Sequence, residues 1–152
     1  MVINNQISAA KINLLYIVTG ILFVLTLVLS FIDYFTRDHQ LLRVVAGALL
    51  AVYCTMHILD LHYIYYSDGN DKILLRFFYI HIGMRKKKAI EIQKSTLVKF
   101  EIEKSLFGLR KELILHQQVH RNVYKYPAVS ITALSKKQQE NLIASLKRLC
   151  KK

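Results

Sequence analysis

Residues 88 to 116 have the sequence KAIEIQKSTLVKFEIEKSLFGLRKELILH, and this stretch decides the fold. Val98, Phe100 and Ile102 are apolar, and a charged residue follows each of them. Successive side chains of a strand point to opposite faces, so this period of two predicts a strand with one buried face. We therefore expect an antiparallel sheet whose other face is solvated.

Similar short runs lie on both sides of this stretch, at a spacing of roughly ten residues, which is typical of an antiparallel meander. They cover residues 72–82, 87–93, 109–118 and 126–132, and are rich in residues that favour strands. The polar stretch 118–125 is expected to be a connection. The sequence predicts six or seven short strands.

The C-terminal part of the chain changes to a helical period. Ser135 and Gln138 have the spacing of a capping box. Leu142, Leu146 and Leu149 then recur at helical intervals. We expect an amphipathic helix over residues 135–150 that covers apolar surface of the sheet.

Two long apolar runs precede the strands, at residues 12–35 and 41–63. Their few charges lie near the ends, at Asp33 in the first run and at Arg43 and Asp60 in the second. Each run is long enough for a hydrocarbon core of about 30 Å. A cleavable signal peptide is the alternative for the first run, but its apolar core is typically only about 7–15 residues. The sequence predicts a transmembrane helical hairpin.

Charge predicts the orientation of this hairpin. The chain has a net charge of +12, and only three of its 22 Lys and Arg residues precede Ser67. By the positive-inside rule, the N-terminus and the basic tail face the cytoplasm. We therefore expect a membrane anchor at residues 1–66 and a cytoplasmic domain at residues 67–152.

Small and hydroxylated residues recur along both predicted membrane helices. Such residues let helix backbones approach closely in lipid. They are Gly47, Ala51 and Thr55 on the second helix, and Thr19, Thr26 and Ser30 on the first. We expect these residues to pack the helices against each other or against a partner subunit.

Two ionisable residues, His57 and Asp60, lie near the end of the second run. They are three positions apart and would share one helix face. Ionisable groups inside a membrane are costly and often functional, which leaves proton or redox chemistry open. However, both lie close to the basic tail, where their side chains can reach the interface. A structural role at the interface and a contact with a partner are the alternatives.

Four consecutive cations, Arg85, Lys86, Lys87 and Lys88, are expected at a turn between two strands. Beside a membrane anchor, each cation can gain about 1 kcal/mol from anionic lipid headgroups within a Debye length. The alternatives are a contact with a partner protein or with nucleic acid, or solvated turn residues that only orient the hairpin.

The layout of two membrane helices, short strands and a final helix resembles a bacterial family of membrane proteins with a pleckstrin-homology-like (PH-like) domain of the domain-of-unknown-function type. The stretches that carry the resemblance are 90–92, 98–102 and the Phe107-Gly108-Leu109 turn. Glu91 stands where the family usually has proline. The resemblance implies an α+β protein of the bacterial inner membrane, with a PH-like antiparallel barrel or sandwich capped by a C-terminal helix.

The resemblance implies architecture and little chemistry, because its motif residues are turn and core positions. Eukaryotic PH domains bind phosphoinositides mainly through cations between their first two strands. The corresponding turn here, residues 67–71, is acidic. This argues against a phosphoinositide pocket of that kind.

Motifs for catalysis are missing from the sequence, which has no Gly-rich phosphate loop, no closely spaced Cys and His ligands and no HExxH pattern. We expect no enzyme, no cofactor and no metal site, and the lack of a recognition motif argues against nucleic acid. Our first hypothesis is an interaction or scaffold protein, an accessory subunit of a larger membrane complex, with a homo-oligomer left open. The alternatives are a sensor that binds anionic membrane lipids through residues 85–88, and a small intramembrane proton or redox subunit.

Overall fold

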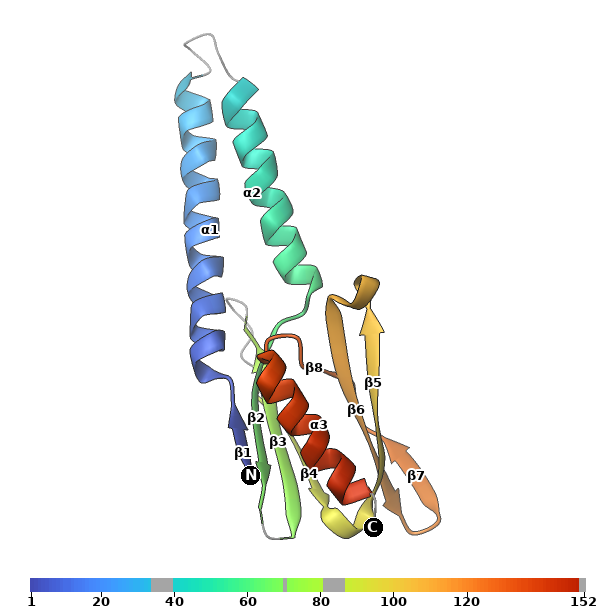
Figure 1. Cartoon of the computed structure of the whole chain (residues 1–152). Helices are drawn as coiled ribbons and strands as arrows, with labels where there is room; N and C mark the ends of the chain where they lie inside the picture. Colours follow the sequence, from blue (N-terminus) through green and yellow to red (C-terminus); the bar gives the residue numbers. More distant parts are fainter. Residues whose placement is uncertain (34–39, 70, 81–86, 151–152) are drawn as a thin grey trace.

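The computed structural model describes residues 1–33, 40–69, 71–80 and 87–150. Two helices, α1 (Gln6–Asp33) and α2 (Gln40–Ile58), lie side by side and project from a β-rich domain (Figure 1). By length and composition, α1 can cross a membrane from Gln6 to Phe31, whereas the apolar part of α2, Leu42–Ile58, is shorter.

The predicted bounds of the two apolar runs need correction. The first helix begins at Gln6, ahead of predicted residue 12, and residues 34–35 lie outside the described part of the chain. The second helix ends at Ile58, and His62 already starts a strand. The predicted boundary between residues 66 and 67 therefore falls inside that strand. The apolar run continues past the end of α2 because His62–Tyr66 forms a strand, and its side chains point alternately to the two faces of the sheet.

The domain consists of two antiparallel sheets. The first has the order β1-β2-β3-β4, and the second has the order β5-β6-β7 with β8 paired to β6. The bounds are β1 Val2–Asn4, β2 His62–Asp68, β3 Lys72–Tyr79, β4 Lys88–Gln93, β5 Leu97–Ser105, β6 Arg110–Val119, β7 Asn122–Lys125 and β8 Val129–Ser130. Among the described residues these two sheets do not close into the barrel that was one form of the expected fold.

Strand β1 comes before the helices in sequence but belongs to the same sheet as the strand that follows them. Val2 pairs with Ser67, and Asn4 pairs with Tyr65. The chain therefore leaves the domain at the start of α1 and returns to it at the end of α2. Both ends of the hairpin are fixed to one sheet.

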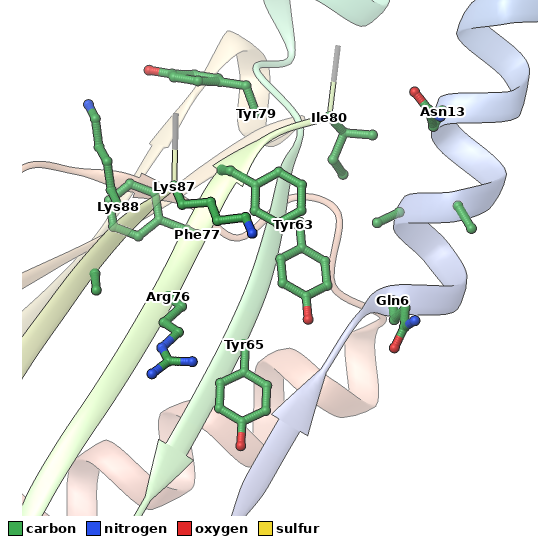
Figure 2. A pocket seen from close by; sticks show the side chains of 14 residues that line it. Gln6, Asn13, Tyr63, Tyr65, Arg76, Phe77, Tyr79, Ile80, Lys87 and Lys88 are labelled. Carbon is green, nitrogen blue, oxygen red and sulfur yellow. The ribbon is translucent and has the colours of Figure 1, made fainter. Parts of the chain in front are cut away.

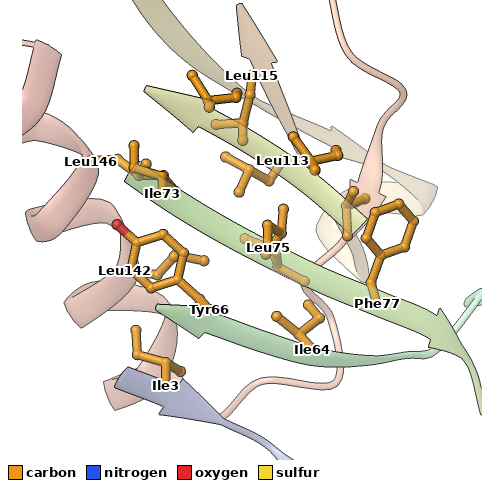
Figure 3. Close-up of a cluster of buried hydrophobic side chains, with 14 of the residues drawn as sticks. Ile3, Ile64, Tyr66, Ile73, Leu75, Phe77, Leu113, Leu115, Leu142 and Leu146 are labelled. Carbon is orange, nitrogen blue, oxygen red and sulfur yellow. The ribbon is translucent and has the colours of Figure 1, made fainter. Parts of the chain in front are cut away.

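The two sheets and the C-terminal helix share one hydrophobic core (Figure 3). Ile64, Ile73 and Leu75 contribute from the first sheet, and Leu113 and Leu115 contribute from β6. All five side chains are almost completely buried. Burial of a side chain of this size contributes about 1.5–3 kcal/mol, so this core is the main source of the stability of the domain.

Helix α3 (Lys136–Cys150) confirms the helix predicted over residues 135–150. The capping box is formed: the Ser135 backbone N–H donates to the Gln138 side chain, and the Gln138 backbone N–H donates to the Ser135 hydroxyl. Leu142 and Leu146 are buried in the core. Between them in sequence, Ser145 is hydrogen-bonded to Tyr66 at 2.9 Å and joins α3 to β2.

Two details of the predicted meander differ from the structure. A bulge between Leu97 and Lys99 turns Val98 outward, and Leu97 takes its place in the core. Phe100 and Ile102 pack against the core as predicted. The polar stretch 118–125, expected to be a connection, holds the end of β6 and the whole of β7.

Candidate functional site

A groove of about 790 Å³ lies between the first turns of α1 and the outer face of the first sheet (Figure 2). It is open because small side chains line it where helix and sheet approach each other: Ala9 and Ala10 on α1, and Ala89 on β4. One wall is aromatic, since Tyr63 and Phe78 stack across β2 and β3 with ring centroids 4.5 Å apart. The groove lies where α1 leaves the domain.

Three cations, Arg76, Lys87 and Lys88, line this groove, and no acidic residue is among its described lining residues. Register places Arg76 opposite Tyr65 on one side and opposite Ala89 on the other. In the described part of the chain these three cations form no ion pair. Lys72 chiefly, and Arg76 to a lesser degree, lower the pKa of the Glu91 carboxyl, so Arg76 lies within electrostatic reach of Glu91. Because none of the three cations is held in an ion pair with a described residue, their charges can attract an anion into the groove.

The polar side chains of the groove can serve a bound anion. Figure 2 shows Tyr63, Tyr65 and Gln6 with their polar ends in the same groove as Arg76 and Lys87. Hydroxyl, amide, guanidinium and ammonium groups can all donate hydrogen bonds to phosphate oxygens. The neighbouring apolar wall suits the uncharged part of an amphiphile.

The buried side chain of Asn5, which is 1% exposed, joins the start of α1 to β2 through hydrogen bonds. Its Nδ2 donates to the His62 carbonyl oxygen at 3.1 Å, and its Oδ1 accepts from the Ile64 N–H at 2.8 Å. The Asn5 carbonyl oxygen also accepts the first helical hydrogen bond, from Ala9. We call this contact the α1 junction.

The end of α2 is tied to β6 by Arg110. Its Nη2 lies 3.0 Å from Asp60 Oδ2 and 2.6 Å from Glu112 Oε1. Its Nη1 donates to the carbonyl oxygen of Ile58, the last residue of α2, at 3.4 Å. We call this contact the α2 junction.

His62 takes part in both junctions. Its carbonyl oxygen accepts from Asn5, and its ring Nδ1 lies 2.8 Å from the Asp60 carbonyl oxygen. Burial lowers the pKa of His62 below its usual value of 6.5, although the Asp60 charge and carbonyl oppose this shift. The positive charges of Arg110 and Lys88 lower the pKa further. His62 is therefore held neutral.

The structure brings part of the predicted basic run to the groove. Lys87 and Lys88 line it at the start of β4 (Figure 2). Arg85 and Lys86 lie outside the described residues. Arg76, Tyr63 and Tyr65 were not among the predicted site residues, although the alternation of β2 and β3 places them on the solvated face.

The small residues of α2 do not pack against α1, and their alternative role, a contact with a partner subunit, stays a prediction. Gly47, Ala51 and Thr55 are exposed, and Gly47 has no atom near the place where a Cβ would lie. The side of α2 that faces α1 instead carries Met56, which is buried, and Tyr53, whose ring meets that of Tyr16 edge-on. Larger side chains thus fill the space between the helices.

The predicted stripe on α1 lies largely out of solvent. Thr19 and Thr26 are buried and Ser30 is half-buried. The Thr26 hydroxyl donates back to the Leu22 carbonyl oxygen at 2.7 Å, so the polar group is satisfied within its own helix.

The placement of His57 and Asp60 on one intramembrane helix face is wrong. Asp60 follows the end of α2, has a positive φ of 50°, and forms the ion pair with Arg110. His57 lies in the last turn of the helix and is exposed. Among the described residues no group of three or more His, Cys, Asp or Glu side chains is arranged to hold a metal ion.

Comparisons of the chain with protein-family models, with curated proteins and with solved structures find no match. The groove and its surroundings are therefore interpreted from their own geometry and chemistry. The described residues form an α+β domain of two antiparallel sheets, and this domain carries an apolar N-terminal helix.

Proposed function

We propose that the protein is a non-enzymatic, membrane-anchored domain that binds an anionic lipid headgroup in the groove at the foot of α1. The observation that carries this proposal is the meeting of Arg76, Lys87 and Lys88, without ion pairs, in a groove that contains no described acidic residue. A headgroup phosphate would lie among these cations. Its glycerol and upper acyl carbons would lie along Ala9, Ala10 and Phe78.

Exposed apolar side chains support the membrane placement. Ile21, Val24 and Phe31 on α1 and Val44 and Ile58 on α2 are exposed, as are most apolar residues of both helices. An apolar surface of this extent is rarely left in contact with water. In a bilayer the same side chains would face acyl chains.

The pairing of β1 with β2 supports two crossings. Because the residues before α1 and after α2 share one sheet, an α1 that crosses the bilayer requires the chain to cross back. Helix α2 is the segment available for this return, despite its shorter apolar part. The groove would then lie at the bilayer surface. The positive charge of the domain favours the cytoplasmic side of a bacterial inner membrane.

The sheet order supports the PH-like interpretation of the domain. A four-stranded sheet and a second sheet built on β5, β6 and β7 share a core that α3 covers. In this proposal the hairpin is an insertion between the first two strands of a PH-like fold, and the ligand site lies outside the sandwich.

Lipid selectivity tests the function. We expect the purified full-length chain in detergent micelles to retain phosphatidylglycerol in preference to phosphatidylcholine, measured as lipid adducts by native mass spectrometry. The double variant R76Q/K87Q should lower this preference roughly tenfold or more, because each cation near an anionic surface contributes about 1 kcal/mol. High salt should weaken the preference of the wild type.

The matched control is Lys72→Gln. Lys72 is on the same strand and the same face as Arg76, but it pairs with Glu91 and does not line the groove. It should leave lipid selectivity unchanged. Equal selectivity in the wild type and the double variant would refute headgroup binding in this groove.

A second candidate function, an accessory subunit of a larger membrane complex, is favoured by the exposed face of α2. Gly47, Ala51 and Thr55 lie away from α1, where a third helix could approach closely. Native mass analysis after gentle extraction should then recover a complex that Gly47→Leu disrupts, while Gly20→Leu on α1 serves as the control. A lone monomer from the wild type would contradict this candidate.

A further inference from the structure

The turn between β5 and β6, Leu106–Gly108, presents apolar side chains to the outside of the domain. Phe107 is fully exposed and Leu109 is 66% exposed. Leu106, Phe107 and Gly108 all have positive φ angles, of 51°, 56° and 87°. We call residues 106–109 the apolar tip.

The backbone of the apolar tip is costly for the side chains it carries. A left-handed conformation costs a residue other than glycine about 1–2 kcal/mol. Leu106 and Phe107 both adopt it, and in water Phe107 gains no burial in return. A conformation of this kind at an exposed aromatic residue points to a contact made outside the domain.

The apolar tip lies on the side of the domain from which the helices project (Figure 1). Arg110, which directly follows the tip, donates to the carbonyl oxygen of Ile58 at the end of α2. This hydrogen bond places the tip close to the point where α2 meets the domain. An apolar helix and an apolar tip therefore approach the same plane.

Positive charge flanks the apolar tip. Lys104 and Lys111 are direct cross-strand partners, whereas the charge of Arg110 is already paired with Asp60 and Glu112. Like charges directly opposite each other on two strands are unfavourable in water. Near an anionic surface the same cations are attracted. An apolar end with the exposed cation of Lys104 beside it, next to an apolar helix, matches the chemistry of a bilayer surface better than that of an apolar protein partner.

We propose that the apolar tip inserts into the bilayer surface and forms a third membrane contact beside α1 and α2. Phe107 and Leu109 would enter the boundary between headgroups and acyl chains, to a depth of about 5–10 Å. Lys104 would remain among the headgroups, whereas Lys111 keeps its hydrogen bond to Gln139 of α3. The proposal rests on the membrane placement of the hairpin and is independent of lipid binding in the groove.

Tryptophan fluorescence tests this directly, because the chain contains no tryptophan. Phe107→Trp supplies a single reporter at a fully exposed position, where the new side chain displaces nothing. The full-length variant is reconstituted in vesicles of phosphatidylcholine and phosphatidylglycerol, with or without lipid brominated on its upper acyl carbons. We expect blue-shifted emission and clear quenching by the brominated lipid.

Two further single-tryptophan variants serve as controls. Tyr124→Trp lies on β7 opposite Gln117, about 23 Å along β6 from Arg110, and should remain unquenched with red-shifted emission. Leu22→Trp in α1 should be strongly quenched and establishes that the hairpin is in the bilayer.

The outcomes distinguish the membrane contact of the apolar tip from the membrane anchor formed by the hairpin. Quenching of Leu22→Trp without quenching of Phe107→Trp overturns the tip contact and leaves the membrane anchor intact. A blue shift at Phe107→Trp without bromine quenching means that protein covers the tip, which also overturns it. If Leu22→Trp itself is unquenched, both the anchor and the tip contact fail.

Discussion

The two junctions between hairpin and domain are made from different chemistry. At the α1 junction a buried neutral amide, Asn5, satisfies a backbone N–H and a carbonyl of β2. At the α2 junction a charged side chain, Arg110, joins Asp60 and the end of the helix while both side chains keep about a quarter of their surface exposed, 27% and 25%. A buried hydrogen bond is costly to remove, whereas a solvated ion pair contributes little. The α1 junction is therefore expected to hold the hairpin more firmly.

The largest effect is expected for Asn5→Ala. The substitution leaves the Ile64 N–H and the His62 carbonyl oxygen buried without partners, which costs about 2–4 kcal/mol. Thermal unfolding of the full-length chain in detergent measures this as a lower Tm. Asn4→Ala is the matched control, because Asn4 is exposed and its side chain bonds only locally, to the N–H and the side-chain oxygen of Gln6, so we expect a loss below about 1 kcal/mol. If Asn4→Ala lowers stability as much as Asn5→Ala, the buried hydrogen bonds of Asn5 do not make the α1 junction the firmer one.

A smaller loss is expected for Arg110→Met. The variant keeps most of the side-chain volume but breaks the contacts with Asp60, Glu112 and the Ile58 carbonyl oxygen. We expect a loss of about 1–2 kcal/mol that decreases as salt is added, because the groups are partly solvated. Lys99→Met, which breaks the more exposed pair with Glu101, should lower Tm less than Arg110→Met does. A loss that does not change with salt would show that Arg110 acts by packing alone.

Acid should weaken both junctions through His62. Because its pKa in the folded chain is lower than 6.5, the unfolded chain takes up a proton first as the pH falls. The contribution of His62 is therefore complete above pH 6.5 and is lost between that value and its folded pKa, at no more than about 1.4 kcal/mol per pH unit. The decrease in Tm between about pH 7.5 and about pH 5.5 should be smaller in His62→Gln than in the wild type. If Tm decreases as much in His62→Gln as in the wild type, His62 is not the source of the decrease.

The smallest effect on stability is expected at the apolar tip. Asparagine tolerates the left-handed conformation better than phenylalanine, so Phe107→Asn should leave Tm in detergent unchanged or raise stability by up to about 1 kcal/mol. Leu142→Ala in the core is the contrast, with an expected loss of about 2–5 kcal/mol. A clear loss for Phe107→Asn would mean that the tip packs against the domain.

Local patterns in the sequence were enough to predict much of the fold. The capping box at Ser135 and Gln138 gave the start of α3, and the alternation after residue 97 gave β5. Each depends on residues close in sequence. For the same reason α1 could be predicted from one apolar run.

Long-range pairing was beyond the same patterns. Val2–Asn4 is too short to show a period, and its partner strand begins at His62. The small residues of α2 suggested one packing face, but the face that meets α1 depends on where both helices are fixed to the domain. The groove likewise exists only because the register of β2, β3 and β4 brings Tyr65, Arg76 and Ala89 side by side.

The position of β1 also imposes an order on synthesis. A ribosome completes β1 first, but its partner β2 follows only after both helices have been made. Pairing Asn5 with Ile64, 59 residues further on, closes a loop that contains the whole hairpin. The entropic cost of closing such a loop is reduced once the helices have formed and shortened the distance between its ends. The sheet is therefore completed only after both helices have been made, which makes formation of the hairpin a precondition for the finished domain.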